Sequence, residues 1–128
     1  MTPTSLVLVA LGGALGSVLR YSLSVTLTGR YALASFPMAT LLVNLIGSLL
    51  IGILFAFLLR ENTVVHSQLK IFLGAGLLGG FTTFSTFSVE SLALFQRGEI
   101  TLLITYCVLS VFGGLALCFL GYRIASGW

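Results

Sequence analysis

Long apolar runs alternate with short polar connectors along the whole chain. Four runs are long enough to span a bilayer, since about 20 predominantly apolar residues cross its hydrocarbon core as a helix. These runs cover residues 5–27, 36–59, 71–96 and 100–122. The connectors hold nearly every charged side chain and are too short for another domain. The pattern predicts an all-α membrane protein in which residues 1–128 form a single transmembrane domain of four helices.

The composition requires a lipid environment. Hydrophobic residues make up 58% of the chain and charged residues only 7%, and the mean hydropathy is +1.16. A soluble domain carries about 25% charged residues, and a small one leaves much of its surface in water. Six Lys and Arg with three Asp and Glu do not cover such a surface. We expect membrane lipid as a partner and no nucleic acid.

A cleavable signal peptide is the alternative interpretation of the first run. Residues 32–34 read Ala-Leu-Ala and resemble a cleavage site. However, no Lys or Arg precedes the run, and the run is longer than the apolar part of a signal peptide. We therefore expect the first run to be a retained helix.

The third run contains an unusual polar stretch, GGFTTFSTF, at residues 79–87. Glycines are poor helix formers, and Ser and Thr hydroxyls compete for backbone partners. Within lipid, a helix break persists only where its freed backbone groups meet protein, water or an ion. Many transport proteins build an ion site from such a break. We predict that the third helix is broken at the bilayer midplane; a simple glycine kink at a helix crossing is the alternative.

Polar side chains recur at helical spacing in two other runs. Thr40, Asn44 and Ser48 are each four residues apart and form one line on a helix face. Tyr106 and Ser110 are likewise four apart, and Gly114 continues their row. Hydrogen bonds between helices explain such rows in many membrane proteins. Asn44 is the more informative residue, because a buried amide brings two donors that need partners.

Aromatic rings alternate with hydroxyls in the second half of the polar stretch of the third run. Phe84 and Phe87 share one helix face, whereas Thr83, Thr86 and Glu90 lie along another. Packing is one interpretation of the two rings. Because the edge of an aromatic ring is partly positive, two edges facing a channel also suit contact with an anion.

Basic residues are balanced between the two membrane sides. With four spans, one side holds Arg60, Lys70 and Arg123, and the other holds Arg30 and Arg97 with Arg20 nearby. Such a balance gives almost no preferred orientation. Two interpretations stay open, a weakly biased protein oriented by other signals and a chain that inserts both ways and forms an antiparallel pair.

Two small-residue motifs favour a homo-oligomer. Gly12-x-x-x-Gly16 and Gly76-x-x-x-Gly80 have the spacing that lets helix backbones approach closely in lipid. Each motif is weak by itself in a chain with 15 glycines.

The segment GLLGGFTTFSTFSVES at residues 76–91 resembles the signature of the small dual-topology fluoride channels, the Fluc or CrcB family. The resemblance covers the whole chain and includes GGALGSVLRY at 12–21 and ATLLVNLIGS at 39–48. It implies a passive fluoride-selective channel in the cell inner membrane that lowers cytoplasmic fluoride. It further implies an antiparallel homodimer with two pores, each lined by both subunits.

The resemblance also assigns individual residues. Asn44 matches the donor to fluoride, Phe84 and Phe87 match the pore phenylalanines, and Arg20 matches a basic vestibule residue. Thr40, Tyr106 and Ser110 match polar pore-lining positions. Ser48 from the polar row, with Thr83 and Ser85 from the polar stretch, completes the set of pore-lining candidates. Main-chain oxygens of Gly79 and Thr82 match the ligands of a structural Na⁺ at the dimer interface. Gly114 departs from the pattern, because some relatives carry a hydroxyl there.

Other functional classes fit less well. A small multidrug-type proton-coupled cation exporter, the main alternative, needs a carboxylate in its first span, and this first span has none. A noncatalytic assembly subunit does not explain the polar line around Asn44. Catalysis is not expected, since His66 is solitary and no nucleophile has a nearby base. The role of Glu90, at an interface or in a vestibule, stays open.

Overall fold

The computed structural model describes residues 2–30, 36–58 and 64–127, and these ranges are helical apart from short turns. Within them, four segments are long and apolar enough to cross a membrane, as the sequence predicts. They are Pro3–Thr28, Met38–Leu58, Ser67–Gln96 and Ile100–Ser126. The fourth helix runs past residue 122 and includes Arg123, whose long side chain can reach toward water from a helix end. The possible cleavage site at 32–34 and Arg60 lie outside the described residues.

The helical elements follow one another in four rods. The first two rods are α1 (Pro3–Arg30) and α2 (Met38–Leu58). The third is assembled from α3 (Val64–Leu69), the π-helical segment η1 (Lys70–Leu78), α4 (Gly79–Phe81) and α5 (Phe84–Gln96). The fourth contains α6 (Ile100–Val108), the π-helical segment η2 (Leu109–Gly113) and α7 (Gly114–Ser126).

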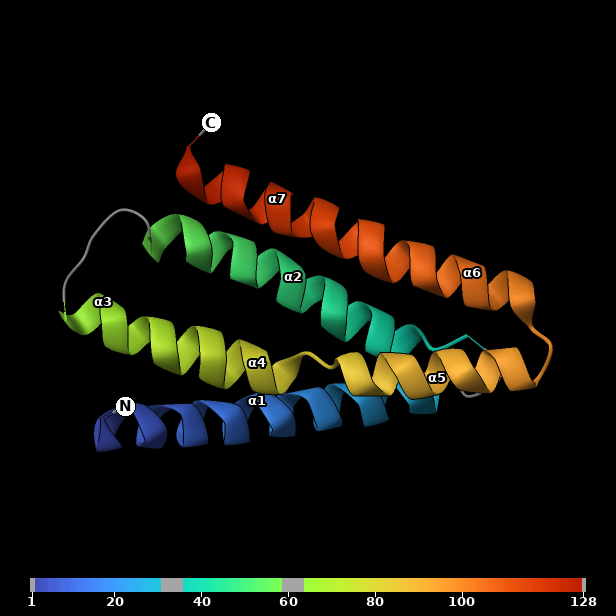
Figure 1. The fold of residues 1–128 in the computed structure, drawn as a ribbon, viewed down its shortest axis with the longest axis horizontal. Coiled ribbons are helices and arrows are strands. Elements are labelled where there is room, and N and C mark those ends of the chain that lie inside the picture. Colours follow the sequence, from blue (N-terminus) through green and yellow to red (C-terminus); the bar gives the residue numbers. More distant parts are fainter. Residues whose placement is uncertain (1, 31–35, 59–63, 128) are drawn as a thin grey trace.

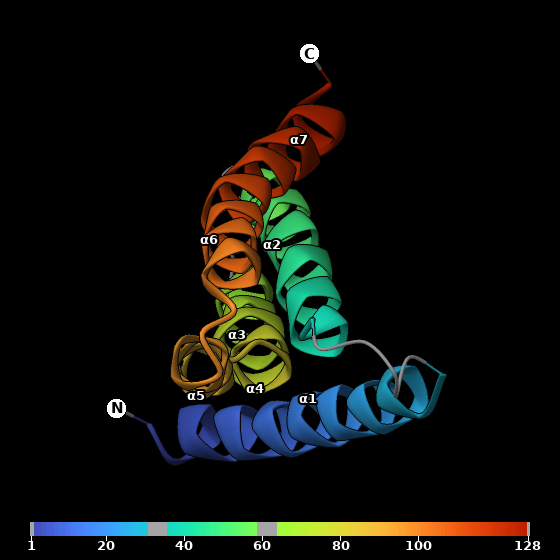
Figure 2. The ribbon, with the colours of Figure 1, turned by 90° about the vertical axis from the view of Figure 1, so that its right-hand side faces the viewer.

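The third rod lies between α1 and α2, and the fourth rod lies on the other side of α2 (Figure 1). Figure 2 shows the same order from the end of the molecule, with α1 running across the base of the third rod. The centre of the arrangement is thus the face where α2 meets the third rod.

Glycines set the closest helix crossings. A Cβ added to Gly76 would lie 3.0 Å from Cα of Gly12, and one added to Gly80 would lie 2.5 Å from the carbonyl oxygen of Gly13. A Cβ on Gly16 would clash with the backbone of η1. The two small-residue motifs therefore pack α1 against η1 and α4 within one chain. The sequence favours contacts between chains at these motifs, whereas in the structure their glycines contact helices of the same chain.

The crossing of α2 with α7 is built in the same way. A Cβ on Gly52 would clash with the carbonyl group of Cys118, and one on Gly121 would clash with that of Leu49. These two glycines let the backbones touch. Neither glycine belongs to the two small-residue motifs.

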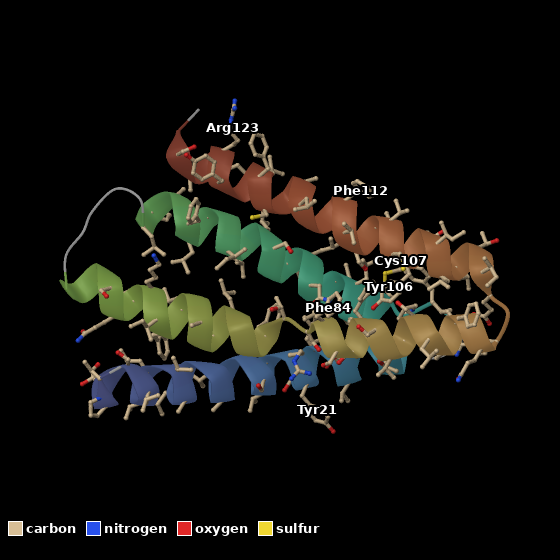
Figure 3. All side chains as sticks on the ribbon, viewed as in Figure 1. Tyr21, Phe84, Tyr106, Cys107, Phe112 and Arg123 are labelled. Carbon is tan, nitrogen blue, oxygen red and sulfur yellow. The ribbon has the colours of Figure 1, made fainter. Side chains whose placement is uncertain are left out.

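Most large apolar side chains face outward. Tyr21 and Phe112, for example, are 71% and 67% exposed, and they point away from the helices (Figure 3). The buried apolar residues form a short set, consisting of Leu41, Val43, Ala56, Leu78, Phe81, Leu94 and Tyr106. An apolar exterior over four long helices is the surface expected of a protein solvated by lipid.

Candidate functional site

The backbone of the third rod leaves the helical conformation at two threonines. The backbone is helical at Gly79, with φ −63° and ψ −37°, and α4 continues to Phe81. Thr82 has φ −83° and ψ 159°, and Thr83 has φ −150° and ψ 120°, both in the extended region. The glycines of GGFTTFSTF thus remain helical, and Gly80 lies in close contact with Gly13 of α1. We call Thr82–Thr83 the interruption.

Side chains replace the hydrogen bonds that the interruption removes. In a continuous helix, the Thr83 N–H would donate to the Gly79 carbonyl. Here it donates to Oδ1 of Asn44 at 2.8 Å, and Nδ2 of Asn44 donates to the Thr83 carbonyl at 2.9 Å. The Gly80 carbonyl accepts from Nε of Arg20 at 3.1 Å. The structure thus brings Asn44 and Arg20 to the interruption from two other helices.

Hydroxyls close the two helix ends at the interruption. Oγ1 of Thr82 donates to the Leu78 carbonyl at 3.0 Å. Oγ1 of Thr83 accepts from the N–H of Thr86 at 3.2 Å and so caps α5. It also lies 3.2 Å from Oγ of Ser85, which is exposed. Thr83 and Ser85, predicted to line a pore, therefore form a hydroxyl cluster at the start of α5.

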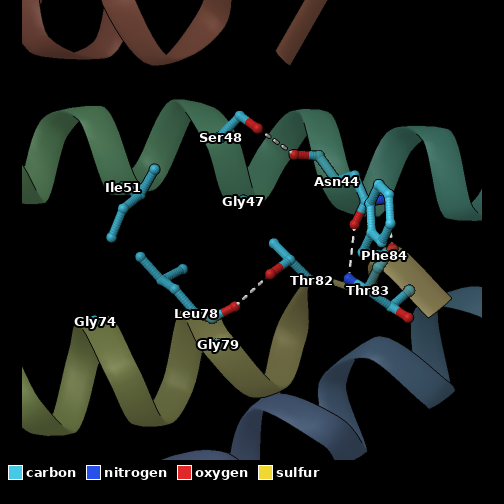
Figure 4. Close-up of a pocket in the computed structure, with 10 residues that line it drawn as sticks. All are labelled: Asn44, Gly47, Ser48, Ile51, Gly74, Leu78, Gly79, Thr82, Thr83 and Phe84. Carbon is cyan, nitrogen blue, oxygen red and sulfur yellow. Dashed lines mark hydrogen bonds between the residues drawn. The ribbon is translucent and has the colours of Figure 1, made fainter. Parts of the chain in front are cut away.

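A cavity of about 410 Å³ lies between α2 and the interruption (Figure 4). It collects four of the predicted pore residues, Asn44, Ser48, Thr83 and Phe84, together with both predicted cation ligands, Gly79 and Thr82. The remaining lining residues are Gly47, Ile51, Gly74 and Leu78.

Two short contacts shape the α2 wall of this cavity. A Cβ on Gly47 would clash with the methyl group of Thr82, so Gly47 makes room for the interruption. Oγ of Ser48 donates to the Asn44 carbonyl at 2.8 Å. The sequence predicts one polar row of Thr40, Asn44 and Ser48. In the structure only Asn44 and Ser48 line the cavity, and Thr40 lies outside it.

Aromatic rings continue from the cavity along α5. The rings of Phe84 and Phe87 have centroids 5.6 Å apart, which confirms that they share a face. Phe84 is 79% exposed and lines the cavity. Phe87 is half-buried, and its ring centroid lies 5.0 Å from that of the buried Tyr106. The two phenylalanines thus connect the cavity with the fourth rod.

Beyond Phe87, three helices meet at one carboxylate. Oε1 of Glu90 accepts from the Thr40 hydroxyl at 2.8 Å, and Oε2 accepts from the Tyr106 hydroxyl at 2.7 Å. Thr40 and Tyr106 are both buried. The sequence left the role of Glu90 open. A carboxylate in an apolar span needs donors, and that requirement is a signal that could have directed attention to polar residues on neighbouring spans.

The fourth rod faces the cavity wall at Gly114. A Cβ there would lie 3.3 Å from Oγ of Ser48. The hydroxyl of Ser110, one turn earlier, is buried and has no hydrogen-bond partner among the described residues. The structure thus places Gly114 against Ser48, whereas Ser110 is not part of the cavity lining.

These features define a small helical membrane protein whose interrupted helix borders a cavity that is mostly apolar and carries a few polar side chains. Residues 7–122 match the family described as CrcB-like protein, Camphor Resistance (CrcB). Since the match covers nearly all of the chain, the protein belongs to this family.

Curated relatives are similar over almost their whole length. The chain is 49% identical over 119 residues to the fluoride-specific ion channel FluC of Thermus thermophilus, covering 93% of both proteins. It is 47% identical over 118 residues to the protein of the same name from Flavobacterium psychrophilum, covering 92% of this chain and 94% of that one. The fluoride-specific ion channel FluC 2 of Rhodococcus jostii is 45% identical over 124 residues.

Proposed function

We propose that this protein is a fluoride-selective channel of the cell inner membrane, through which fluoride leaves the cytoplasm passively. The observation that carries the proposal is the 49% identity, over 93% of the chain, to a relative named as a fluoride-specific ion channel. The family assignment also weighs against the proton-coupled cation exporter considered from the sequence. A channel performs transport rather than catalysis.

The cavity beside the interruption offers the donors that a small anion needs. One N–H of Asn44 Nδ2 is used by the Thr83 carbonyl, and an amide has a second N–H to offer. Phe84 presents its ring at the same cavity, and a ring edge is partly positive. Neutral donors of this kind replace water around an anion without holding it as tightly as a fixed cation would.

The path in our proposal continues from Phe84 past Phe87 to the fourth rod. The polar candidates on that side are Thr40, Tyr106 and Ser110. The hydroxyls of Thr40 and Tyr106 donate to Glu90, so their orientation depends on that carboxylate. The Ser110 hydroxyl has no partner among the described residues and is a further donor for the path.

The proposed channel is an antiparallel homodimer of dual topology with two pores. Its interruption lies at the bilayer midplane, and the two copies meet there. The Gly79 carbonyl supports this arrangement. In a continuous helix it would accept from the Thr83 N–H, which donates to Asn44 instead, and Gly79 borders the open cavity. Gly79 and Thr82 of two copies would offer four hard carbonyl oxygens, a donor set that fits Na⁺. A bound Na⁺ would supply positive charge that neutralises these dipoles at the interface.

Fluoride efflux from liposomes tests the function directly. Liposomes loaded with fluoride and carrying the purified protein should release it within seconds to minutes, and liposomes loaded with chloride should not. Equal release of both anions, or no release of either, would contradict the proposal.

Orientation variants test the dimer separately. Three lysines added to either membrane side should force one orientation and abolish fluoride release. Coexpression of the two oppositely biased variants should restore it. Full activity of either variant alone would exclude the antiparallel dimer while leaving the channel function intact.

A further inference from the structure

Arg20 has an unusual partner for a cation on a membrane-spanning helix. It lies on α1 inside the span Pro3–Thr28 and is half-buried. Its Nε donates to the Gly80 carbonyl at 3.1 Å, across a separation of 60 residues. The partner is thus a backbone carbonyl of the third rod.

The Gly80 carbonyl is one of the groups that the interruption deprives of a partner. In a continuous helix it would accept from the N–H of Phe84, four residues later. Because Thr82 and Thr83 are extended, α5 begins anew at Phe84 and its first N–H cannot serve that carbonyl. An unpaired carbonyl within lipid is costly. The Nε–H of Arg20 occupies the place of the missing donor.

Close packing holds this donor in position. Gly80 lies against Gly13, and Gly16 lies against the backbone of η1, so α1 is pressed onto the end of α4. One turn along α1 from Gly16, the side chain of Arg20 reaches the interruption. The glycine crossing and the Arg20 bond therefore form one unit, in which α1 supports the C-terminal end of α4.

We infer that Arg20 is a positioning residue: its Nε–H substitutes for the lost helix hydrogen bond at Gly80, keeps α4 and α5 apart, and so holds Asn44, Thr83 and Phe84 in place for the ion. This inference rests on the proposed channel function. It differs from a vestibule role, in which the charge of Arg20 attracts anions at the pore mouth.

Two substitutions separate the donor from the charge. In glutamine, Nε2 is the same number of bonds from Cα as Nε is in arginine, so Arg20→Gln retains an N–H at that place and loses the charge. In lysine a methylene group occupies that place, so Arg20→Lys retains the charge but loses the donor at the position of Nε, its ammonium lying one bond farther out. The pair is matched because each variant keeps one property and removes the other.

The experiment measures fluoride and chloride efflux from liposomes at low and high ionic strength. Arg20→Gln should keep fluoride flux within about threefold of the unmodified protein and retain its selectivity over chloride, since a neutral hydrogen bond replaces a charged one. Arg20→Lys should lower fluoride flux by about tenfold or more and reduce the selectivity ratio, equally at both ionic strengths. Size-exclusion chromatography checks that each variant is folded.

The opposite pattern would overturn the inference. If Arg20→Lys is fully active and Arg20→Gln is impaired mainly at low ionic strength, the charge acts by attraction, which salt screens. Normal flux in both variants, or loss of flux in Arg20→Gln, also contradicts a positioning bond. If Arg20→Lys does not fold, an active Arg20→Gln still supports it. Absence of fluoride flux in the unmodified protein would instead contradict the channel function.

Discussion

Two regions of this molecule bring helices together by opposite means. Where α2 crosses α7, Gly52 and Gly121 let the two backbones touch, and the helices keep their internal hydrogen bonds. Where α2 meets the third rod, the backbone of Thr82 and Thr83 leaves the helix, and Asn44 pairs with it. The first region is closed, and the second borders an open cavity of about 410 Å³.

The contrast follows from the bilayer as solvent. Lipid offers no hydrogen bonds, so backbone groups must be satisfied either within a helix or by another part of the protein. A glycine crossing uses the first solution and needs only a small side chain. An interruption needs dedicated polar partners, and those partners remain next to any space that the interruption opens. We therefore expect changes at the glycine crossing to affect stability and changes at the interruption to affect transport.

Asn44→Asp should give the largest effect on transport. The carboxylate can still accept from the Thr83 N–H, but it cannot donate to the Thr83 carbonyl, and it places negative charge in the proposed anion path. We expect fluoride flux to fall on the order of 100-fold, since a negative charge then lies beside the Thr83 carbonyl, which has lost its donor, at a cost of about 3 kcal/mol or more. Liposome efflux measures the loss. Ile46→Val on the same helix is the control and should retain the flux, since Ile46 is exposed and does not line the cavity. Unchanged flux in Asn44→Asp would remove this residue from the pathway.

Gly121→Ala should show the reverse behaviour. Its Cβ would clash with the Leu49 carbonyl, so α7 must move away from α2. Overpacking of this kind costs about 1–3 kcal/mol, and we expect a lower midpoint in thermal unfolding in detergent. Gly13→Ala is the matched control, because its Cβ would lie 4.0 Å from the nearest atom, the Gly76 carbonyl oxygen. Equal stability of the two variants would show that the α2–α7 crossing is not tightly packed.

Phe84→Ile and Phe87→Ile should both lower transport, but only the second should also lower stability. Loss of an aromatic edge is worth about 1 kcal/mol, so each substitution should reduce fluoride flux by about fivefold. Phe84 is 79% exposed and should be replaced without loss of stability. Phe87 packs on Tyr106, so its replacement should also lower the unfolding midpoint. Normal flux in both variants would identify the rings as packing residues.

Gly114→Ser should have the smallest effect. Its Cβ would lie 3.3 Å from Oγ of Ser48, a tight but tolerable contact, and its hydroxyl would extend the polar row of the fourth rod. We expect fluoride flux to rise by about twofold, as one modest hydrogen bond permits. Gly114→Ala adds the Cβ without the hydroxyl and should give no increase. Similar flux in the two variants would show that the hydroxyl is irrelevant at this position.

Much of the architecture follows from the sequence alone. The four spans could be predicted because, in lipid, apolar length by itself selects a helix. The importance of Asn44 and of residues 79–87 was also visible, since polar atoms are conspicuous in apolar spans. The exact place of the interruption was less clear. Glycine has low helix propensity, yet Gly79 and Gly80 stay helical, and the two threonines after Phe81 become extended.

The partners of the polar groups were decided only by the tertiary structure. Helices in lipid lack a hydrophobic drive to associate, so no periodic pattern reveals which faces meet. The sequence therefore did not show that Thr40 and Tyr106 converge on Glu90. It also did not show that Arg20 serves the Gly80 carbonyl. These pairings join residues 16 to 60 positions apart, and they depend on close glycine contacts that only the packed helices create.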